Sequence, residues 1–220
     1  MAKILLGVTG SVAASRTPDL YNALKNEGHQ VRIAATESSL YFFDAEAFGN
    51  AGIDSDSGLP GRVLFRDQDE WPGTRYHRGD PVLHIELRRW ADIFVVAPLD
   101  ANSLAKFALG ISDNLLSCVY RAWEPEKPIV LAPAMNTRMW DHPVTLRHLR
   151  QIVADRSETP IDPDFSLKSL LESSASKARR LILIPPQSKA LACGDIGMGA
   201  MAEVATISSI VQSWIAQSES

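Results

Sequence analysis

The chain has 220 residues, of which 45% are hydrophobic and 22% are charged, a composition typical of a globular domain. Its net charge of -4 and pI near 5.7 argue against a surface built to bind nucleic acid. No apolar run approaches the roughly 20 residues of a membrane-spanning helix, and the N-terminus starts a strand without a signal peptide. We therefore expect a single domain over residues 1–220, with no membrane partner, in the cytoplasm.

The two cysteines, Cys118 and Cys193, lie far apart and have no Cys or His nearby at the spacing of metal ligands. We expect neither a disulfide framework nor a metal site. Cys118 shares the apolar side of a predicted helix with Leu115 and Val119, so it is predicted to lie in the core.

Residues 3–9 form a continuous apolar run that predicts a buried parallel strand. Gly10 permits a tight turn after this strand, and Ser11 can cap the helix that runs to about Asn26. The amides of the first helical turn favour an anion such as phosphate, although a plain strand-to-helix turn explains the same residues. Because the segment lacks the GxGxxG fingerprint, a dinucleotide site has little support.

A second strand, residues 30–35, leads into a hydroxyl-rich segment, Thr36 to Ser39. These hydroxyls are candidates for a flavin phosphate or ribityl chain; a capped helix start is the other interpretation, and both can hold. Residues 49–80 are rich in Gly, Pro and Asp and predict a loop with one short strand at 63–65.

His84 has apolar neighbours and precedes a helix predicted at 87–91. A histidine in such a place is more often structural than catalytic. Because histidine as a residue type titrates near neutral pH, His84 is still the best acid or base candidate in the chain.

The next strands end in polar loops. Residues 92–97 predict a buried strand, followed by helices at 104–109 and 113–123. A further strand at 129–132 breaks into Pro133-Ala-Met-Asn136. The amide of Asn136, with two donors and an acceptor, thus follows the carboxyl end of a strand, where open α/β sheets bind their ligands.

The C-terminal third contains two irregular segments. Residues 155–178 are polar and predict a loop insertion with a short helix at 167–172. The last strand is predicted at 180–184. The glycine-rich stretch 186–203 suggests a flap that closes over a substrate, with a structural loop as the alternative. Strands alternate with helices up to a final helix at 207–216, which predicts an α/β three-layer sandwich with a parallel sheet.

Six segments in order carry a resemblance to a known family: GVTGSVAA (7–14), HIELRRWAD (84–92), APLDANSLAK (97–106), SDNLL (112–116), PAMNTRMW (133–140) and LACGDIGMGAMAE (191–203). They resemble the homo-oligomeric flavin-containing cysteine decarboxylases, and within that family the enzymes that act on 4'-phosphopantothenoylcysteine. The resemblance covers nearly the whole chain apart from 49–75 and 155–178. It implies a flavodoxin-like (Rossmann-type) fold, FMN as cofactor, and a homotrimer or multiple of trimers with FMN at a subunit interface.

The resemblance and the turns above give the predicted FMN contacts: Gly10, Ser11, Val12, Thr36, Ser39, Phe42, Asp100, Ala101, Asn102, Ser103 and Met135. The family commonly has Ser-Ala-Asn-Thr where this chain has Asp100 to Ser103. A carboxylate beside the FMN phosphate would repel it, so a bond from Asp100 to a backbone amide or to a neighbouring subunit is the alternative.

The same resemblance implies the catalytic roles. His84 would act as the base, Asn136 would hold the carboxylate of the substrate, and Cys193 would donate a proton during the reductive half of the reaction. Supporting substrate contacts are predicted for Met139, Lys189 and Ala192.

The implied activity is the FMN-dependent decarboxylation of 4'-phosphopantothenoylcysteine to 4'-phosphopantetheine in coenzyme A biosynthesis, a carboxy-lyase reaction. The alternatives are a peptidyl-cysteine decarboxylase of lantibiotic maturation, a flavin prenyltransferase and a phosphatase-binding regulatory relative. HIELRRWAD and the flap favour the small-molecule enzyme, and Cys193 argues against the prenyltransferase. The short C-terminal end lacks the long acidic tail of the phosphatase-binding relatives. A plain electron carrier would not explain His84, Asn136 and Cys193 together.

Overall fold

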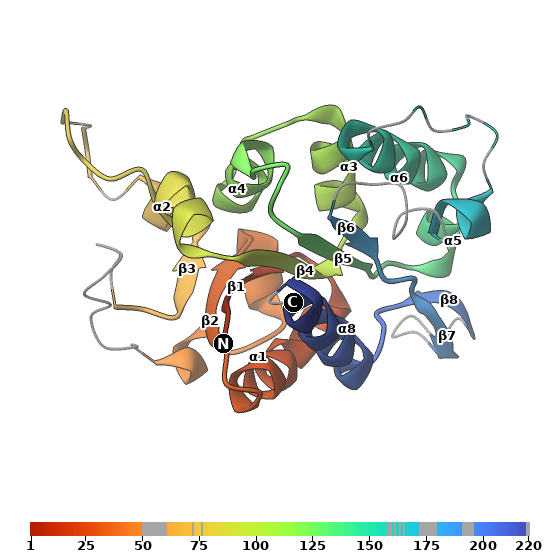
Figure 1. Ribbon diagram of the computed structural model, residues 1–220, viewed down its shortest axis with the longest axis horizontal. Coiled ribbons are helices and arrows are strands. Elements are labelled where there is room, and N and C mark those ends of the chain that lie inside the picture. The colour runs from red at the N-terminus through yellow and green to blue at the C-terminus, as the bar shows by residue number, and fades with distance from the viewer. Residues whose placement is uncertain are drawn as a thin grey trace.

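The computed structural model describes most of the chain, namely residues 1–49, 61–71, 73–75, 77–157, 160, 162, 164, 166–171, 180–190 and 196–218. Its central element is a six-stranded parallel sheet in the order β3-β2-β1-β4-β5-β6 (Figure 1). The strands are β1 (Lys3–Val8), β2 (Gln30–Ala35), β3 (Leu64–Arg66), β4 (Ile93–Leu99), β5 (Ile129–Pro133) and β6 (Leu181–Leu183). All six strands lie where the apolar runs predict them, to within two residues.

Helices cover both faces of the sheet, which confirms the predicted three layers (Figure 1). One face carries α1 (Thr17–Asn26) and α8 (Val204–Ser218). The other face carries α2 (Leu83–Trp90), α3 (Ala101–Leu109), α4 (Leu115–Ala122) and α6 (Pro143–Arg156).

Most residues of the strands are apolar and buried, because successive side chains point to opposite faces of the sheet and helices cover both. In β1, Ile4 and Leu6 pack in the cluster that includes α1 and α8, whereas Leu5 packs in the cluster that includes α2, α3, α4 and α6. All three side chains are fully buried. Each contributes about 1.5–3 kcal/mol to stability relative to an exposed side chain.

The strand order determines where a ligand can bind. From β1 the chain builds outward through β2 to β3, and then returns to place β4 on the other side of β1. This is the order of the Rossmann-type doubly wound fold, and its reversal lies between β1 and β4. The loops that leave β1 and β4 diverge there, and the crevice between them is the usual ligand site.

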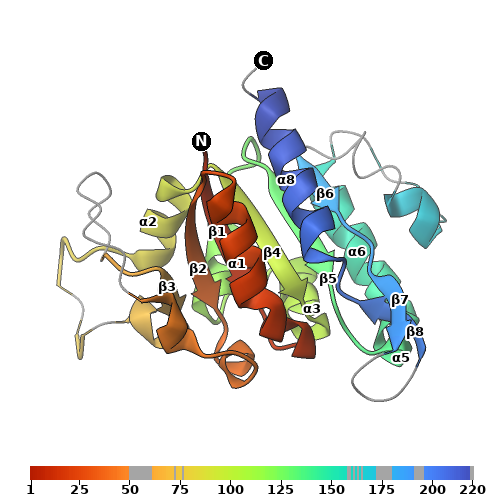
Figure 2. The same cartoon turned by 90° about the horizontal axis from the view of Figure 1, so that it is seen from below.

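Three elements differ from the sequence-based expectation. The predicted glycine-rich flap contains an antiparallel hairpin, β7 (Gln187–Ala190) and β8 (Ile196–Ala200), so 180–184 is not the last strand. The predicted loop after β5 contains a single helical turn, α5 (Thr137–Trp140), which contacts β8. Figure 2 shows α5 and the hairpin together at the end of the sheet where β4 and β5 terminate.

Two helix predictions also change. Helix α2 begins four residues before the predicted start at 87, so His84 lies in its first turn. Cys118 is partly exposed, and its prediction as a core residue is wrong; its thiol donates to the backbone O of Ser112 at 3.6 Å. Leu115 and Val119 on the same helix are buried as expected.

The polar segment 155–178 is described only in part. Residues 167–171 are helical, as predicted, and buried Leu170 joins the core cluster beneath α6. The end of that predicted helix at 172 lies outside the described residues. In the part of the chain that the structure describes, no helix is both long enough and apolar enough to cross a bilayer.

Candidate active site

A pocket of about 510 Å³ lies at the carboxyl ends of β1, β4 and β5, at the reversal of strand order. This volume is within the range of about 300–1,000 Å³ that is usual for small-molecule and cofactor sites. Most of the predicted FMN contacts line it, namely Gly10, Ser11, Val12, Phe42, Asp100, Ala101, Asn102 and Met135. The predicted substrate residues Asn136, Met139 and Lys189 line it as well.

Gly10 is needed for close approach between two loops. A Cβ on Gly10 would lie 2.4 Å from the Oγ of Ser38 and 2.8 Å from its Cβ, so that Ser38 would have to move away. Next to it, the Ser11 hydroxyl accepts a hydrogen bond from Ala13 N at 3.3 Å and caps the short helix η1 (Val12–Arg16), as predicted. The reason for glycine is therefore the space beside Ser38 rather than a turn with positive φ.

Three predicted FMN contacts do not line the pocket: Thr36, Ser39 and Ser103, all buried. The Ser39 hydroxyl donates to the backbone O of Thr36 at 2.6 Å, inside the turn η2 (Glu37–Tyr41). Thr36 Oγ1 lies 3.2 Å from Ser38 Oγ. The hydroxyl that borders Gly10 is that of Ser38. The sequence analysis predicted the hydroxyl-rich segment 36–39 but selected Thr36 and Ser39 from it, not Ser38.

Asp100 caps helix α3. Its Oδ1 accepts a hydrogen bond from Ser103 N at 2.8 Å, while Oδ2 lies on the side of the pocket near Gly10. Of the two roles that the sequence left open for this carboxylate, the bond to a backbone amide is the one seen.

Asn136 is held by the short helix α5. Its Oδ1 accepts a hydrogen bond from Arg138 N at 2.8 Å, which orients the amide with its oxygen toward the helix. The preceding residue, Met135, donates from its backbone N to the O of Gly199 in β8 at 2.9 Å. Gly199 has a φ of 141°, and a Cβ there would lie 2.2 Å from Met135 O. The hairpin is thus tied to the Asn136 loop at a position that requires glycine.

Charged groups of the hairpin and of η1 meet at the rim of the pocket. Glu203 accepts hydrogen bonds from Lys189 Nζ and from Gln187 Nε2, and the Lys189 bond is the main reason that its pKa lies below the ordinary value. Arg16 Nη1 lies 3.9 Å from the other Glu203 oxygen. Cys193 and Ala192, which lie between β7 and β8 in the sequence, are outside the described residues.

His84 does not line this pocket. It belongs to α2, which lies toward the β3 edge of the sheet in both views (Figures 1 and 2). Helix α5, which Asn136 caps, lies toward the opposite edge, that of β6. Its partner is Glu70, whose side chain is only 2% exposed: Oε1 lies 2.5 Å from His84 Nδ1, and Oε2 accepts from His84 N at 3.0 Å. Sequence reasoning missed Glu70, because it lies in the patternless segment 49–80.

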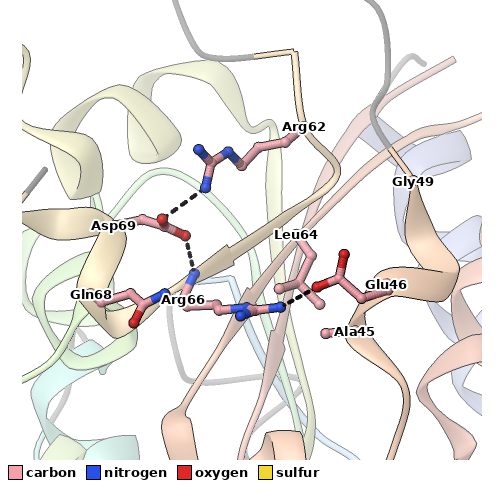
Figure 3. A pocket seen from close by; sticks show the side chains of 8 residues that line it. All are labelled: Ala45, Glu46, Gly49, Arg62, Leu64, Arg66, Gln68 and Asp69. Atoms are coloured by element: carbon pink, nitrogen blue, oxygen red, sulfur yellow. Dashed lines mark hydrogen bonds and ion pairs between the residues drawn. The ribbon is translucent and has the colours of Figure 1, made fainter.

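A second pocket, beside β3, is a poor candidate for an anion or a substrate (Figure 3). Its two arginines are already paired with carboxylates: Arg62 with Asp69 at 2.7 Å, and Arg66 with Glu46 at 2.8 Å. Their charges are therefore compensated within the pocket itself.

The lining of the first pocket fits a flavin. Apolar side chains such as Val12, Phe42 and Met135 can contact an aromatic ring system, while Ser11 and Asn102 offer hydrogen bonds to a polar chain. Among the described residues, no group of three or more His, Cys, Asp or Glu is placed to hold a metal ion.

Comparison with known proteins agrees with this geometry. Residues 1–216 match the Flavoprotein family. The phosphopantothenoylcysteine decarboxylase of Mus musculus is 43% identical over 216 residues, which are 98% of this chain and 88% of that protein.

Solved structures show the same similarity. A PPC decarboxylase mutant complexed with pantothenoylaminoethenethiol is 42% identical, with a TM-score of 0.74 and 97% of each chain covered. The FMN binding protein AtHal3 is 43% identical, with a TM-score of 0.70, covering 97% of this chain and 96% of its own.

Proposed function

Because the chain belongs to the flavoprotein family, we infer that it decarboxylates 4'-phosphopantothenoylcysteine to 4'-phosphopantetheine with bound FMN. It is a carboxy-lyase of coenzyme A biosynthesis. The observation that carries this conclusion is identity of about 43% along nearly the whole chain with decarboxylases of that name, together with the pocket at the strand reversal. We place the reaction in the cytoplasm.

Bound FMN would accept two electrons from the carbon that bears the substrate thiol, so that the carboxylate on the adjacent carbon can leave as carbon dioxide, and would return them to the product, so that no external reductant is needed. The protein supplies position and proton transfer. We assign FMN binding to Gly10, Ser11, Val12 and Met135, which line the pocket. Phe42, Asp100, Ala101 and Asn102, which line the same pocket, complete the set that we assign to it.

We assign the substrate carboxylate to Asn136. Its oxygen faces Arg138 N, so the donor end of the amide is the part that suits an anion. A neutral donor holds a carboxylate without the strong ionic clamp that would oppose its departure. Met139, which is 48% exposed at the pocket, and Lys189 are assigned to the rest of the substrate, with Ala192.

Cys193 is assigned as the proton donor. A thiol has an ordinary pKa near 8.5 and can release a proton at neutral pH. In the sequence, Cys193 belongs to the glycine-rich stretch 186–203, which we propose to be a flap over the substrate.

His84 is assigned as the base, and this requires a second copy of the chain. Helix α2, which contains His84, lies toward the β3 edge of the sheet, and α5, which Asn136 caps, lies toward the β6 edge (Figure 1). One chain therefore cannot present both residues to one substrate. We propose a homotrimer, or a multiple of trimers, in which His84 of one copy faces the pocket of the next. Trp71, next to Glu70 in the sequence, is 73% exposed and is available for such a contact.

The test is to incubate the purified protein with 4'-phosphopantothenoylcysteine and, separately, with a peptide that ends in cysteine, and to determine the product masses. We expect loss of carbon dioxide from the first substrate. Turnover of the peptide alone, or a protein that binds no FMN on reconstitution, would overturn the proposal.

Two variants test the assigned roles. His84→Asn is expected to lower carbon dioxide release at least about 100-fold while FMN stays bound, since acid–base groups contribute about 10²–10⁴ to rate. The matched control is His77→Asn, at an exposed histidine outside the pocket. Cys193→Ser should still release carbon dioxide but accumulate the enethiol product. Normal yields of 4'-phosphopantetheine from the serine variant would remove Cys193 from the mechanism.

A further inference from the structure

Glu70 is a buried carboxylate whose two oxygens both bind a single residue, His84. It ends the short helix η4 (Asp67–Glu70), and its side chain is 2% exposed. A carboxylate removed from water is costly unless its oxygens are hydrogen-bonded. Both bonds go to the residue that we assign as the base.

One of these bonds has a structural explanation. His84 is in the first turn of α2, and Val82, which precedes that helix, makes no side-chain cap. The Oε2 of Glu70 accepts the backbone N–H of His84 at 3.0 Å and so serves as the missing cap. Capping needs one oxygen and would leave the orientation of the imidazole unrestricted.

The second bond acts on the ring. Oε1 lies 2.5 Å from Nδ1, so the backbone and the imidazole of His84 are anchored to the same carboxylate. An ionised carboxylate only accepts hydrogen bonds, and therefore Nδ1 carries the proton. In the neutral imidazole the lone pair is then on Nε2, the nitrogen that points away from Glu70 and can receive a proton.

We propose that Glu70 is a positioning residue of the decarboxylase: it holds the His84 ring in one orientation and keeps Nε2 as the basic nitrogen. The proposal rests on the function of His84 proposed above. Glu70 itself does not touch the substrate, and it acts through the imidazole.

The test uses Glu70→Gln, which keeps the size of the side chain. The amide oxygen must face the His84 backbone N–H, because the NH₂ group cannot accept from it. The NH₂ group then donates to Nδ1, which moves the ring proton to Nε2 and removes the basic nitrogen. We expect the cap, the melting temperature and FMN content to be retained, and carbon dioxide release to fall at least about 100-fold.

NMR of protein labelled with ¹⁵N-histidine separates this role from a structural one. The His84 signals are assigned by their absence from His84→Asn. In the wild type we expect neutral His84 to be protonated on Nδ1, and in Glu70→Gln on Nε2. A wild-type ring protonated on Nε2 would overturn the proposal, whether or not the variant folds. A variant with the wild-type rate would overturn it too.

Two further variants complete the design. Asp69→Asn changes the neighbouring carboxylate of η4, which binds Arg66 N and Arg62, and should leave decarboxylation unchanged. In the His84→Asn background, Glu70→Gln should cause no further loss, since a residue that acts through His84 is silent without it. If wild type does not decarboxylate the substrate, the proposed function fails, while the NMR result still shows whether Glu70 determines which nitrogen of His84 carries the proton.

Discussion

The hydroxyl of Thr9 accepts a hydrogen bond from the backbone N–H of Asp100, with 2.7 Å between the two atoms. The same hydroxyl donates to the backbone O of Pro98 at 2.8 Å, and Thr9 is fully buried. Thr9 follows β1 and Asp100 follows β4, the two strands between which the sheet order reverses. One side chain therefore joins the loops that follow β1 and β4, and Gly10 and Asp100 of these loops line the pocket.

Replacing Thr9 by Val should weaken the connection between these two loops. The variant keeps the size of the side chain but leaves Asp100 N without its acceptor, a loss of about 1–3 kcal/mol for a buried donor. We expect a lower free energy of unfolding in urea and weaker FMN binding by the apoprotein. Thr9→Ser, which keeps the hydroxyl, is the control and should bind FMN as the wild type does. Equal effects of Val and Ser would show that the hydroxyl is unimportant.

Gly10→Ala tests the contact between the first loop and Ser38. The added Cβ would lie 2.4 Å from Ser38 Oγ, so η2 must shift away from the pocket. Overpacking of this kind costs about 1–3 kcal/mol, and we expect weaker FMN binding in a fluorescence titration. The double variant Gly10→Ala, Ser38→Gly removes both clashing atoms of Ser38 and should recover much of the loss. No recovery would place the cause elsewhere.

The sequence predicts the pocket because the pocket depends on strand ends. Parallel strands have their carboxyl ends at one edge of the sheet, so residues that follow β1, β4 and β5 must lie near one another. Gly10, Asp100 and Asn136 meet these conditions and line the same cavity. The apolar runs identify the strands because both faces of each strand are buried.

The local sequence does not show which residues from separate segments contact one another in the folded protein. The Glu70–His84 contact joins a patternless segment to a helix across 14 residues, and no periodicity points to it. Residues 196–200 contain two glycines, which are rare within strands, so the sequence does not show that they pair with 187–190 or that Gly199 accepts a hydrogen bond from Met135. The sequence likewise does not show that the Ser39 hydroxyl bonds to the backbone O of Thr36 within η2 instead of facing the pocket.

Asp100→Ser tests the effect of a carboxylate near the cofactor. Serine keeps an acceptor for Ser103 N and caps helices about as well as aspartate, so stability should change little. Removal of the negative charge should tighten FMN binding about two- to fivefold, the size of a partly exposed electrostatic effect of about 0.3–1 kcal/mol. The gain should shrink in high salt.

Asp100→Ala, which loses the cap, should cost about 1 kcal/mol of stability. Weaker FMN binding by the serine variant would mean that the carboxylate contributes a favourable contact.

The pair of Lys106 and Asp113 should give a pH-dependent contribution to stability. Lys106 Nζ on α3 binds both carboxylate oxygens of Asp113, at 2.7 and 2.9 Å, just before α4 begins. This hydrogen bond lowers the pKa of Asp113 from its ordinary value of 3.8. The folded protein therefore binds fewer protons than the unfolded chain just below pH 3.8. The stability that the ion pair contributes is complete above that pH and is lost as the pH falls further.

Because Asp113 is 55% exposed, Asp113→Asn should cost only about 0.5 kcal/mol at pH 7. Urea unfolding of both proteins should show this difference shrinking below pH 3.8 and in 1 M salt, as expected for a screened ion pair. A difference that stays constant with pH and salt would show that the substitution acts through packing instead.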